Sequence, residues 1–400
     1  MKGVPPQGKQ VSIGPLKLLL ESKRYIGVVE GDSTPQKFIP ELVEMQRSGR
    51  LPLEKLFTTY PYEQLNQAMD DMHAGQATNI WTALLALGAF AAAAPSTNST
   101  TILPSHTIYT FPNTTFVDIE NVAVRPNGHI LLNLLTAASV YTLDPCSAHP
   151  NASLVYTFPN GTKLDGLVEF RPDVFAFVVG DALNSTTATY AIWSLDFNES
   201  PPVPAKIADV PGSIALNGIT TLTGSFSDTL LIADAKLGAV WRLDATTGIS
   251  SIALKDSHFL PAAAIAFGIN GVHVFEGTLY FSTSANYTFG SVPISANGTL
   301  LGDDLKIIAT QLSGSDFVDY DDFIIHASGR YAWMANHAED LVRIDLVTGE
   351  QVVVATGLTQ PTAAAFARGK GGHETSVLYV VTQGNDTSPI ISGEVVEVLT

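Results

Sequence analysis

Residues 216–254 read LNGITTLTGSFSDTLLIADAKLGAVWRLDATTGISSIAL and contain one complete unit of a repeat. Their apolar runs predict four short strands, over 219–222, 229–234, 239–244 and 249–254, separated by turns rich in Gly, Ser, Asp and Thr. Strands of this length joined by tight turns form an antiparallel meander. The stretch is therefore expected to be one four-stranded antiparallel sheet.

The same pattern begins again five times in the chain. The six units start 45, 52, 53, 52 and 40 residues apart, at Glu120, Asp165, Asn217, Asn270, Asp322 and Thr362. A four-stranded unit repeating about every 40–50 residues is typical of a β-propeller, because no blade buries both of its faces alone. The sequence therefore predicts an all-β fold, a six-bladed β-propeller of four-stranded antiparallel blades over residues 96–400.

The sixth unit ends one strand short. Its predicted strands cover 362–366, 377–382 and 393–398, and the chain then ends at Thr400. A further predicted strand, 106–111, precedes the first unit and can supply the missing outermost strand. Pairing the two ends of the propeller would close the ring and remove an exposed sheet edge.

Charge and cysteine content restrict the possible partners. The formal net charge is −17, and residues 1–76 contribute none of it, because they hold 9 basic and 9 acidic groups. An acidic propeller argues against nucleic acid and anionic membranes as partners. Cys146 is the single cysteine, so no intrachain disulfide forms, and we expect it to be a small buried side chain.

An apolar segment, residues 77–95, precedes the propeller. It includes the run IWTALLALGAFAAAAPS, which starts at Ile80, is short for a membrane span and ends in small residues, as a secretory signal does. A buried helix is the alternative. Nine N-x-Ser/Thr sequons follow this segment and none precedes it: Asn98, Asn113, Asn151, Asn160, Asn184, Asn198, Asn286, Asn297 and Asn385. We therefore expect a signal-like apolar helix on a secreted glycoprotein, with no stable membrane association once the signal is removed.

Residues 1–76 carry a different kind of pattern. The motifs YIGVVEGDSTPQKFIPELVE from Tyr25, SGRLPLEKL from Ser48 and LNQAMDDMHAG from Leu65 resemble the C-terminal end of zinc-type aryl-alcohol dehydrogenases. The zinc ligands and the glycine fingerprint of that family lie further upstream and are absent, so this small α/β fragment is expected to bind neither zinc nor nicotinamide. We interpret it as a truncated piece joined to the propeller by a gene-model error; a genuine fusion is the alternative.

The starts of the first strands are the candidate site. In a propeller these strands line the central channel, so the six starting residues converge on one mouth. Three carboxylates and two amides on one axis suit a hard cation, and Ca²⁺ prefers such oxygen ligands. The alternatives are that Asn217 and Asn270 only form Asn-Gly turns, and that Glu120 and Asp322 only cap solvated strand ends.

The propeller also resembles the senescence marker protein/gluconolactonase family of six-bladed propellers, especially its secreted fungal branch. The resemblance rests on IENVAVRPNGHILL from Ile119, FGINGVHVFEGTLYFS from Phe267, YDDFIIHASGRYAWMANH from Tyr320 and the motif order along residues 96–400. It implies a divalent ion on Glu120, Asn270 and Asp322, with Asn217 on the substrate side or as a further ligand.

The chain departs from that family's pattern at two of these positions. The family's Glu-Gly-Pro is replaced by Glu120-Asn121-Val122, and its Asp-Gly is replaced by Asp321-Asp322-Phe323. Either aspartate could therefore be the ligand. The arginine that often grips the substrate has no clear counterpart.

The first functional hypothesis is metal-assisted hydrolysis of a lactone or ester. A divalent cation, Ca²⁺ in first place, would polarise the carbonyl while a carboxylate takes a proton from water. Asp322 or Asp321 is the first candidate for this base, and Asp165 is the second. His337, expected at the end of a second strand, could serve instead or bind substrate; a structural histidine is the alternative.

The second hypothesis comes from the same fungal branch, which includes hetero-Diels–Alderases that join a polyketide-derived quinone methide to a terpene. Such a pericyclase needs a shape-matched apolar pocket with hydrogen-bond donors and no nucleophile. Phe267, Phe323 and Trp333 are candidates for its walls, although packing between blades is the alternative for all three. A third hypothesis is a propeller that only binds a ligand. In each case we expect a monomer whose partner is a small molecule.

Overall fold

The computed structural model describes residues 58–60, 80–82, 99–181, 189–262, 267–299, 301, 305–310, 320–337, 339–369 and 374–400. The chain divides into two compact units, Met1–Ala93 and Ala94–Thr400. In the first unit β1 (Thr58–Tyr60) pairs in parallel with β2 (Ile80–Thr82). The β2 residues belong to the predicted apolar helix, but Ile, Trp and Thr favour extended backbone. The dehydrogenase-like motifs and the rest of the apolar segment lie outside the described residues.

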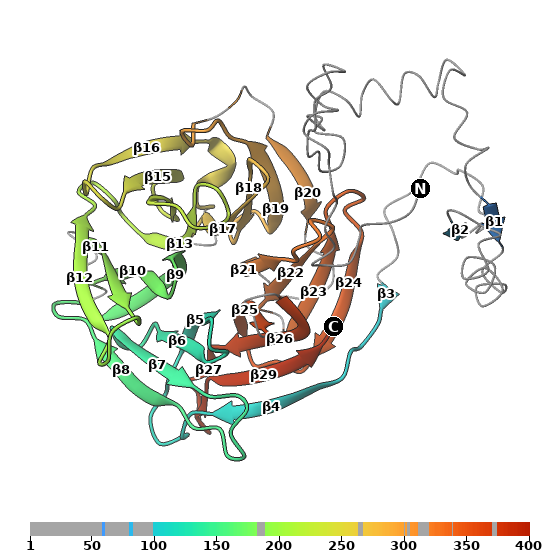
Figure 1. Ribbon diagram of the computed structural model, residues 1–400, viewed down its shortest axis with the longest axis horizontal. Coiled ribbons are helices and arrows are strands. Elements are labelled where there is room, and N and C mark those ends of the chain that lie inside the picture. The colour runs from blue at the N-terminus through green and yellow to red at the C-terminus, as the bar shows by residue number, and fades with distance from the viewer. Residues whose placement is uncertain are drawn as a thin grey trace, which may run out of the picture. The chain divides into compact units, whose positions relative to one another are not determined.

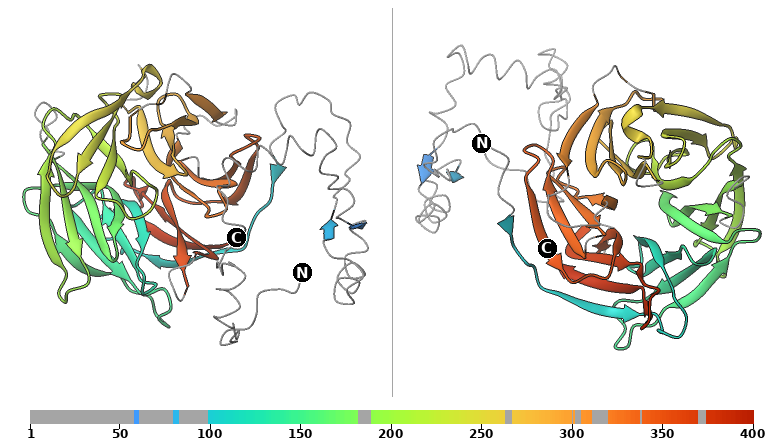
Figure 2. Two further views of the ribbon diagram at one scale, coloured as in Figure 1. Left: turned by 45° about the horizontal axis from the view of Figure 1, so that its top comes forward. Right: turned by 180° about the vertical axis from the view of Figure 1, so that it is seen from behind.

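The second unit is the predicted six-bladed propeller, with its blades arranged around a central axis (Figures 1 and 2). In each blade four strands pair antiparallel, and the innermost strand precedes the next two strands along the chain. Blades one to three consist of β5 (Ile119–Val124), β6 (Ile130–Leu134), β7 (Ser139–Leu143) and β8 (Ser153–Thr157); β9 (Lys163–Arg171), β10 (Val174–Gly180), β11 (Tyr190–Asp196) and β12 (Val203–Asp209); and β13 (Leu216–Thr221), β14 (Thr229–Asp234), β15 (Ala239–Asp244) and β16 (Ser250–Lys255).

The other three blades follow the same order. They consist of β17 (Ile269–Phe275), β18 (Thr278–Thr283), β19 (Thr288–Pro293) and β20 (Lys306–Thr310); β21 (Tyr320–Ile325), β22 (Tyr331–Asn336), β23 (Asp340–Asp345) and β24 (Gln351–Thr356); and β25 (Pro361–Arg368), β26 (Glu374–Thr382), β29 (Glu394–Leu399) and β4 (Ser105–Thr110). A 3-10 turn, η4 (Ser257–Phe259), lies between blades three and four.

The closure of the ring agrees with the prediction. Strand β4, from the start of the propeller, pairs antiparallel with β29, from its end, with Val395 opposite Tyr109. Two small features were not predicted. A short strand, β3 (Ser99–Thr100), adds in parallel to the outer edge of blade five, and β27 (Gly384–Asn385) and β28 (Ile391–Ser392) form a small hairpin between β26 and β29.

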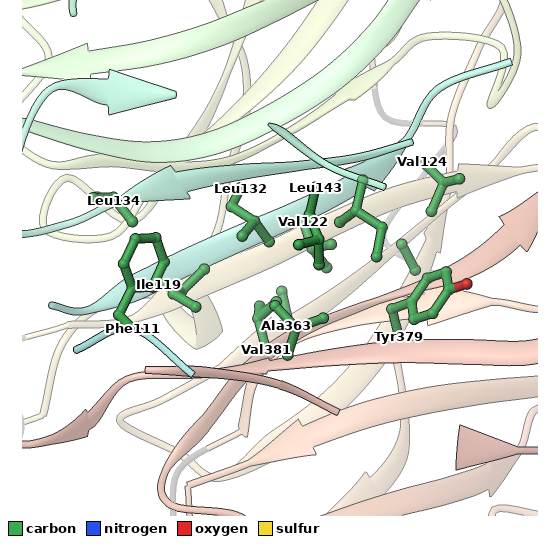
Figure 3. Close-up of a cluster of buried hydrophobic side chains, with 13 residues drawn as sticks. Phe111, Ile119, Val122, Val124, Leu132, Leu134, Leu143, Ala363, Tyr379 and Val381 are labelled. Carbon is green, nitrogen blue, oxygen red and sulfur yellow. The ribbon is translucent and has the colours of Figure 1, made fainter. Parts of the chain in front are cut away.

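Six clusters of buried apolar side chains hold neighbouring blades together, one at each of the six junctions. The junction of blades six and one, where the ring closes, contains Ile119, Val122 and Leu132 of blade one packed against Ala363 and Val381 of blade six (Figure 3). These side chains are completely or almost completely buried. Burial of each Val, Leu or Ile side chain stabilises the folded state by roughly 1.5–3 kcal/mol. The blades are therefore fixed to one another by burial around the whole ring.

The innermost strands pack closely behind the mouth residues. A Cβ atom at Gly166 would lie 2.6 Å from the carbonyl oxygen of Asn217, and one at Gly218 would lie 2.6 Å from that of Asn270. Glycine thus lets the first strands of blades two, three and four approach backbone to backbone, which brings the residue before each glycine close to the axis.

Several surface features bear on the sequence predictions. Cys146 is exposed rather than buried, because it lies in the loop between β7 and β8. The sequon asparagines within the described residues are exposed, except that Asn385 is half-buried; Asn98 and Asn184 fall outside those residues. Glycosylation and secretion stay predictions. Among the described residues, no helix combines the length and apolarity required to cross a membrane.

Candidate active site

A cavity of about 250 Å³ lies where the innermost strands begin, and we call it the mouth cavity. In each antiparallel blade the end of the second strand lies beside the start of the first, so both contribute side chains to this end of the channel. The cavity is lined by Asp118, Glu120, Leu135, Lys163, Asp165, Asn217, Phe267, Asn270, Ser284, Asp321, His337, Thr362 and Gln383.

The structure brings most of the predicted site residues together here. Glu120, Asp165, Asn217 and Asn270 come from the first strands of blades one to four. Asp321 of blade five, His337 after β22 and Phe267 before β17 complete the predicted members. The proposed convergence of distant residues on one hub is therefore present.

Asp322 does not line this cavity. Asp321 lines the mouth cavity, whereas Asp322 lines a cavity formed by later residues of the innermost strands. Asp321 Oδ2 lies 3.3 Å from His337 Nε2 on the mouth side. Of the two aspartates that the sequence left open, Asp321 is the one in contact with the mouth cavity.

Asp322 and Asn121, which replace the two glycines of the related family's pattern, face each other. Asn121 Nδ2 donates a hydrogen bond of 2.7 Å to Asp322 Oδ2, and both side chains are buried. Asp322 Oδ1 also accepts from the backbone N–H of Phe323, at 2.8 Å. The two departures are thus compensated by a single polar bridge between blades one and five.

Trp333 and Phe323 lie away from the mouth cavity. Trp333 is buried in the cluster between blades five and six, and Phe323 is buried in the cluster between blades four and five. Both side chains therefore pack between blades, which was the alternative to a place in the wall of the pocket. Phe267 differs, because its ring is 44% exposed and lines the mouth cavity.

The acidic side chains of the mouth cavity are Asp118, Glu120, Asp165 and Asp321, and we call them the ring of acids. Lys163 forms a buried ion pair within this ring. Its Nζ lies 2.7 Å from Asp165 Oδ1, and the two side chains are 15% and 3% exposed. The ammonium group also lies 5.5 Å from the centre of the Tyr190 ring. Burial alone would lower the pKa of Lys163, but the neighbouring carboxylate of Asp165 outweighs it and raises that pKa, so the lysine stays charged.

The other acids of the ring are held in an environment that disfavours their charge. Burial, reinforced by the charges of Asp321, Asp118 and Asp165, raises the pKa of Glu120 well above its ordinary value. Burial raises the pKa of Asp118 to about 7, although His337 and Gln383 partly oppose this shift. At neutral pH these carboxyl groups can therefore serve as hydrogen-bond donors.

The fit of a cation to the ring is mixed. Three buried oxygens, Asp118 Oδ1, Asp165 Oδ2 and Asn270 Oδ1, have no hydrogen-bond partner among the described residues. However, within that part of the chain no three His, Cys, Asp or Glu side chains stand close enough together to hold a metal ion. The divalent cation stays a prediction.

Sequence reasoning missed two residues that shape the charge of the site. Asp118 and Lys163 each stand two positions before a predicted mouth residue, Glu120 and Asp165 respectively. Because side chains alternate along a strand, residues two apart lie on the same face. Extending the predicted strand starts by one period of this alternation would have found both.

The assembled cavity offers hydrogen-bond donors in a water-poor setting. A charged lysine, protonated carboxyls and the amides of Asn217 and Asn270 surround the space, and Phe267 and Leu135 add apolar surface. No serine or cysteine in it forms a hydrogen bond to a histidine among the described residues, as a nucleophile–base pair would. The arrangement is suited to polarising a carbonyl group rather than to covalent attack.

Two proteins of known sequence are similar to this chain over most of its length. No family model matches the chain. A protein from Phoma sp. named "Putative hetero-Diels-Alderase" is 28% identical over 316 residues, covering 71% of this chain and 88% of the relative. A second protein of that description, from Sarocladium schorii, is 25% identical over 336 residues, covering 74% and 82%.

Solved structures show the same fold. The calcium-binding protein regucalcin from Agrobacterium tumefaciens superimposes with a TM-score of 0.52 at 16% identity, covering 76% of this chain and 95% of its own. A luciferin-regenerating enzyme superimposes with a TM-score of 0.56 at 14% identity, covering 74% and 95%. These likenesses and the two fungal homologues confirm the resemblance of the propeller to this group of proteins.

A third relative concerns a short part of the chain. Geraniol dehydrogenase from Castellaniella defragrans is 35% identical over 77 residues, which is 19% of this chain and 21% of the relative. The length of this match is close to that of the segment interpreted as dehydrogenase-like, residues 1–76.

Proposed function

We propose that this chain is an enzyme that catalyses a hetero-Diels–Alder cycloaddition between two small molecules in the mouth cavity. Two homologues that match most of the propeller carry the name of this activity. The observation that supports it most is the ring of buried donors around Lys163 and Glu120, which can polarise a carbonyl oxygen.

The reaction requires no nucleophile and no leaving group. A conjugated C=C–C=O system, of the kind found in a quinone methide, supplies four atoms, and an alkene supplies two. Two σ bonds form together, and every atom of both reactants stays in the product. Hydrogen bonds to the carbonyl oxygen withdraw electron density from the heterodiene and so lower the barrier to attack by the electron-rich alkene.

Residues of the chain divide this task between them. The Lys163 ammonium and the protonated Glu120 carboxyl donate hydrogen bonds to the carbonyl oxygen, in a buried site where such bonds are strong. Phe267 and Leu135 present apolar surface to the alkene partner. Holding both partners in reacting orientation removes much of the entropic part of the barrier.

Replacing Glu120 tests the donor role. Glu120→Met should lower the acceleration over the uncatalysed reaction by roughly 10²–10³-fold, the usual loss when one donor to a developing oxyanion is removed. Glu120→Gln is the matched control, because it keeps an N–H donor at nearly the same volume, and it should retain far more activity. The assay generates an ortho-quinone methide in solution with a terpene alkene and follows the dihydropyran product by chiral chromatography. Equal rates for the two variants would contradict the donor role.

The rate should also depend on pH in one direction. The pKa of Asp118 is about 7, and its charge acts on the neighbouring donor Glu120. Ionisation of Asp118 therefore places a negative charge near the carbonyl oxygen and opposes the negative charge that develops there in the reaction. The enzymatic rate should therefore be high at pH 5–6 and fall as the pH rises through about 7. The profile is measured as enzymatic minus spontaneous rate at each pH. An enzymatic rate that rises over this range would indicate a carboxylate base instead.

Lactone hydrolysis is the second candidate, favoured by the three unpartnered oxygens on Asp118, Asp165 and Asn270. We infer that, if this is the function, opening of an aldonolactone will require added Ca²⁺ and will stop when EDTA is added. The cycloaddition should be unaffected by EDTA. Hydrolysis that depends on Ca²⁺, without any cycloaddition, would replace the first proposal by the second.

A further inference from the structure

A second cavity occupies the opposite end of the channel. It has a volume of about 420 Å³, within the range of small-molecule sites, and we call it the far cavity. The six innermost strands line it with their later residues, whereas their starts line the mouth cavity. No residue lines both. The far cavity is therefore separate from the site described above.

A histidine and an aspartate that are in contact with each other line the far cavity. His273 Nε2 lies 3.4 Å from Asp322 Oδ1, and the His273 ring packs edge-on against Phe323, with centroids 4.8 Å apart. Asp322 is held in turn by Asn121 Nδ2 and by the backbone N–H of Phe323. In the tautomer whose Nε2–H points toward the carboxylate, the imidazole has a lone pair on Nδ1 that can accept a hydrogen bond. The His273 side chain is 26% exposed and thus within reach of a ligand.

The rest of the far cavity disfavours a charged ligand. Apart from the His273–Asp322 pair, Arg368 and Glu169 are the charged side chains that line it, and they are paired at 2.5 Å. These charges are already matched with one another. Between them and His273 polar and apolar surface line the cavity in nearly equal shares, and Ala123, Val168, Ile324 and Ala365 are among the apolar lining residues.

From this arrangement we infer that the far cavity binds a neutral small molecule that has an apolar body and carries one hydroxyl group. The hydroxyl donates a hydrogen bond to His273, and the apolar body lies between the innermost strands. Asp322, held by Asn121, positions the imidazole.

Titration calorimetry on the full chain tests the inference with two probes of nearly equal shape. 1-Naphthol has the hydroxyl group, and 1-methoxynaphthalene does not. The wild-type protein should bind 1-naphthol about tenfold more tightly, which is the contribution of one buried hydrogen bond. His273→Phe keeps the ring packing and removes the acceptor, so it should abolish this difference while leaving 1-methoxynaphthalene binding unchanged.

Two further variants locate the bound probe. Ala123→Phe places a large side chain in the far cavity at another lining position and should weaken binding of both probes at least tenfold, with folding checked by circular dichroism. Glu120→Gln alters only the mouth cavity and should leave both affinities unchanged. Naphthol binding that survives His273→Phe and Ala123→Phe, binding that is lost in Glu120→Gln, or no binding to the wild-type protein at millimolar concentration would each overturn the inference. None of these outcomes depends on the cycloaddition.

Discussion

Lys163→Met is expected to destabilise the propeller by about 3–5 kcal/mol at pH 8, the usual cost of removing one partner of a buried ion pair. Lys163 and Asp165 are 2.7 Å apart, and their side chains are 15% and 3% exposed. Without the ammonium group, the Asp165 carboxylate would stay buried in a ring that also contains Glu120, Asp118 and Asp321. The free energy of unfolding, measured by urea denaturation of the wild type and the variant, gives this difference.

Two controls separate this effect from a general loss of charge. The double variant Lys163→Met/Asp165→Asn removes both charges and should recover most of the lost stability. Lys206→Met breaks the pair with Asp209, whose side chains are 42% and 67% exposed, and should cost less than about 1 kcal/mol. If Lys163→Met were no more costly than Lys206→Met, the ring of acids would not be buried as described.

Asp118→Asn is expected to have the opposite effect on stability. The pKa of Asp118 is raised from 3.8 to about 7 by folding, so the folded state holds its proton more tightly than the unfolded state. Stability contributed by this proton is fully present below pH 4 and is lost as the pH rises to about 7. By linkage the loss amounts to about 4 kcal/mol, an upper estimate for a group buried as Asp118 is.

Asparagine carries no titrating proton and should remove this pH dependence. The variant should therefore be more stable than the wild type at pH 8 by up to about 4 kcal/mol, and close to it at pH 4. Denaturation at both pH values provides the comparison. If Asp118→Asn were instead less stable than the wild type at pH 8, the Asp118 carboxylate would be stabilised in the folded protein, contrary to the prediction. A gain in stability combined with a loss of activity would mark Asp118 as a group retained for function.

Much of the fold could be predicted because the repeat carries it. The alternation of apolar and polar residues indicates each strand, and the turn residues indicate the meander, so each of the six predicted starting residues lies within two residues of the observed start of an innermost strand. The pairing of β4 with β29 was also accessible, since a sixth blade with three strands needs a fourth. The addition of β3 to blade five has no counterpart in the repeat and could not be inferred.

The sequence predicted which residues meet at the site better than it predicted the charges and the side-chain directions there. Knowing that strand starts converge was enough to group Glu120, Asn217 and Asn270 in one cavity. The direction of Asp321 and Asp322 depends on local register shifts in β21, which the sequence does not reveal. The bridge from Asn121 to Asp322 joins residues 201 positions apart, and only the closed ring brings them into contact.

The position of a bound product tests the account most directly. We expect a crystal structure of the full chain with its dihydropyran cycloadduct to place the product in the mouth cavity, with the ring oxygen within hydrogen-bonding distance of Glu120 or Lys163. A cycloadduct found in the far cavity, or on the outside of the blades, would contradict the assignment of the chemistry to the ring of buried acids.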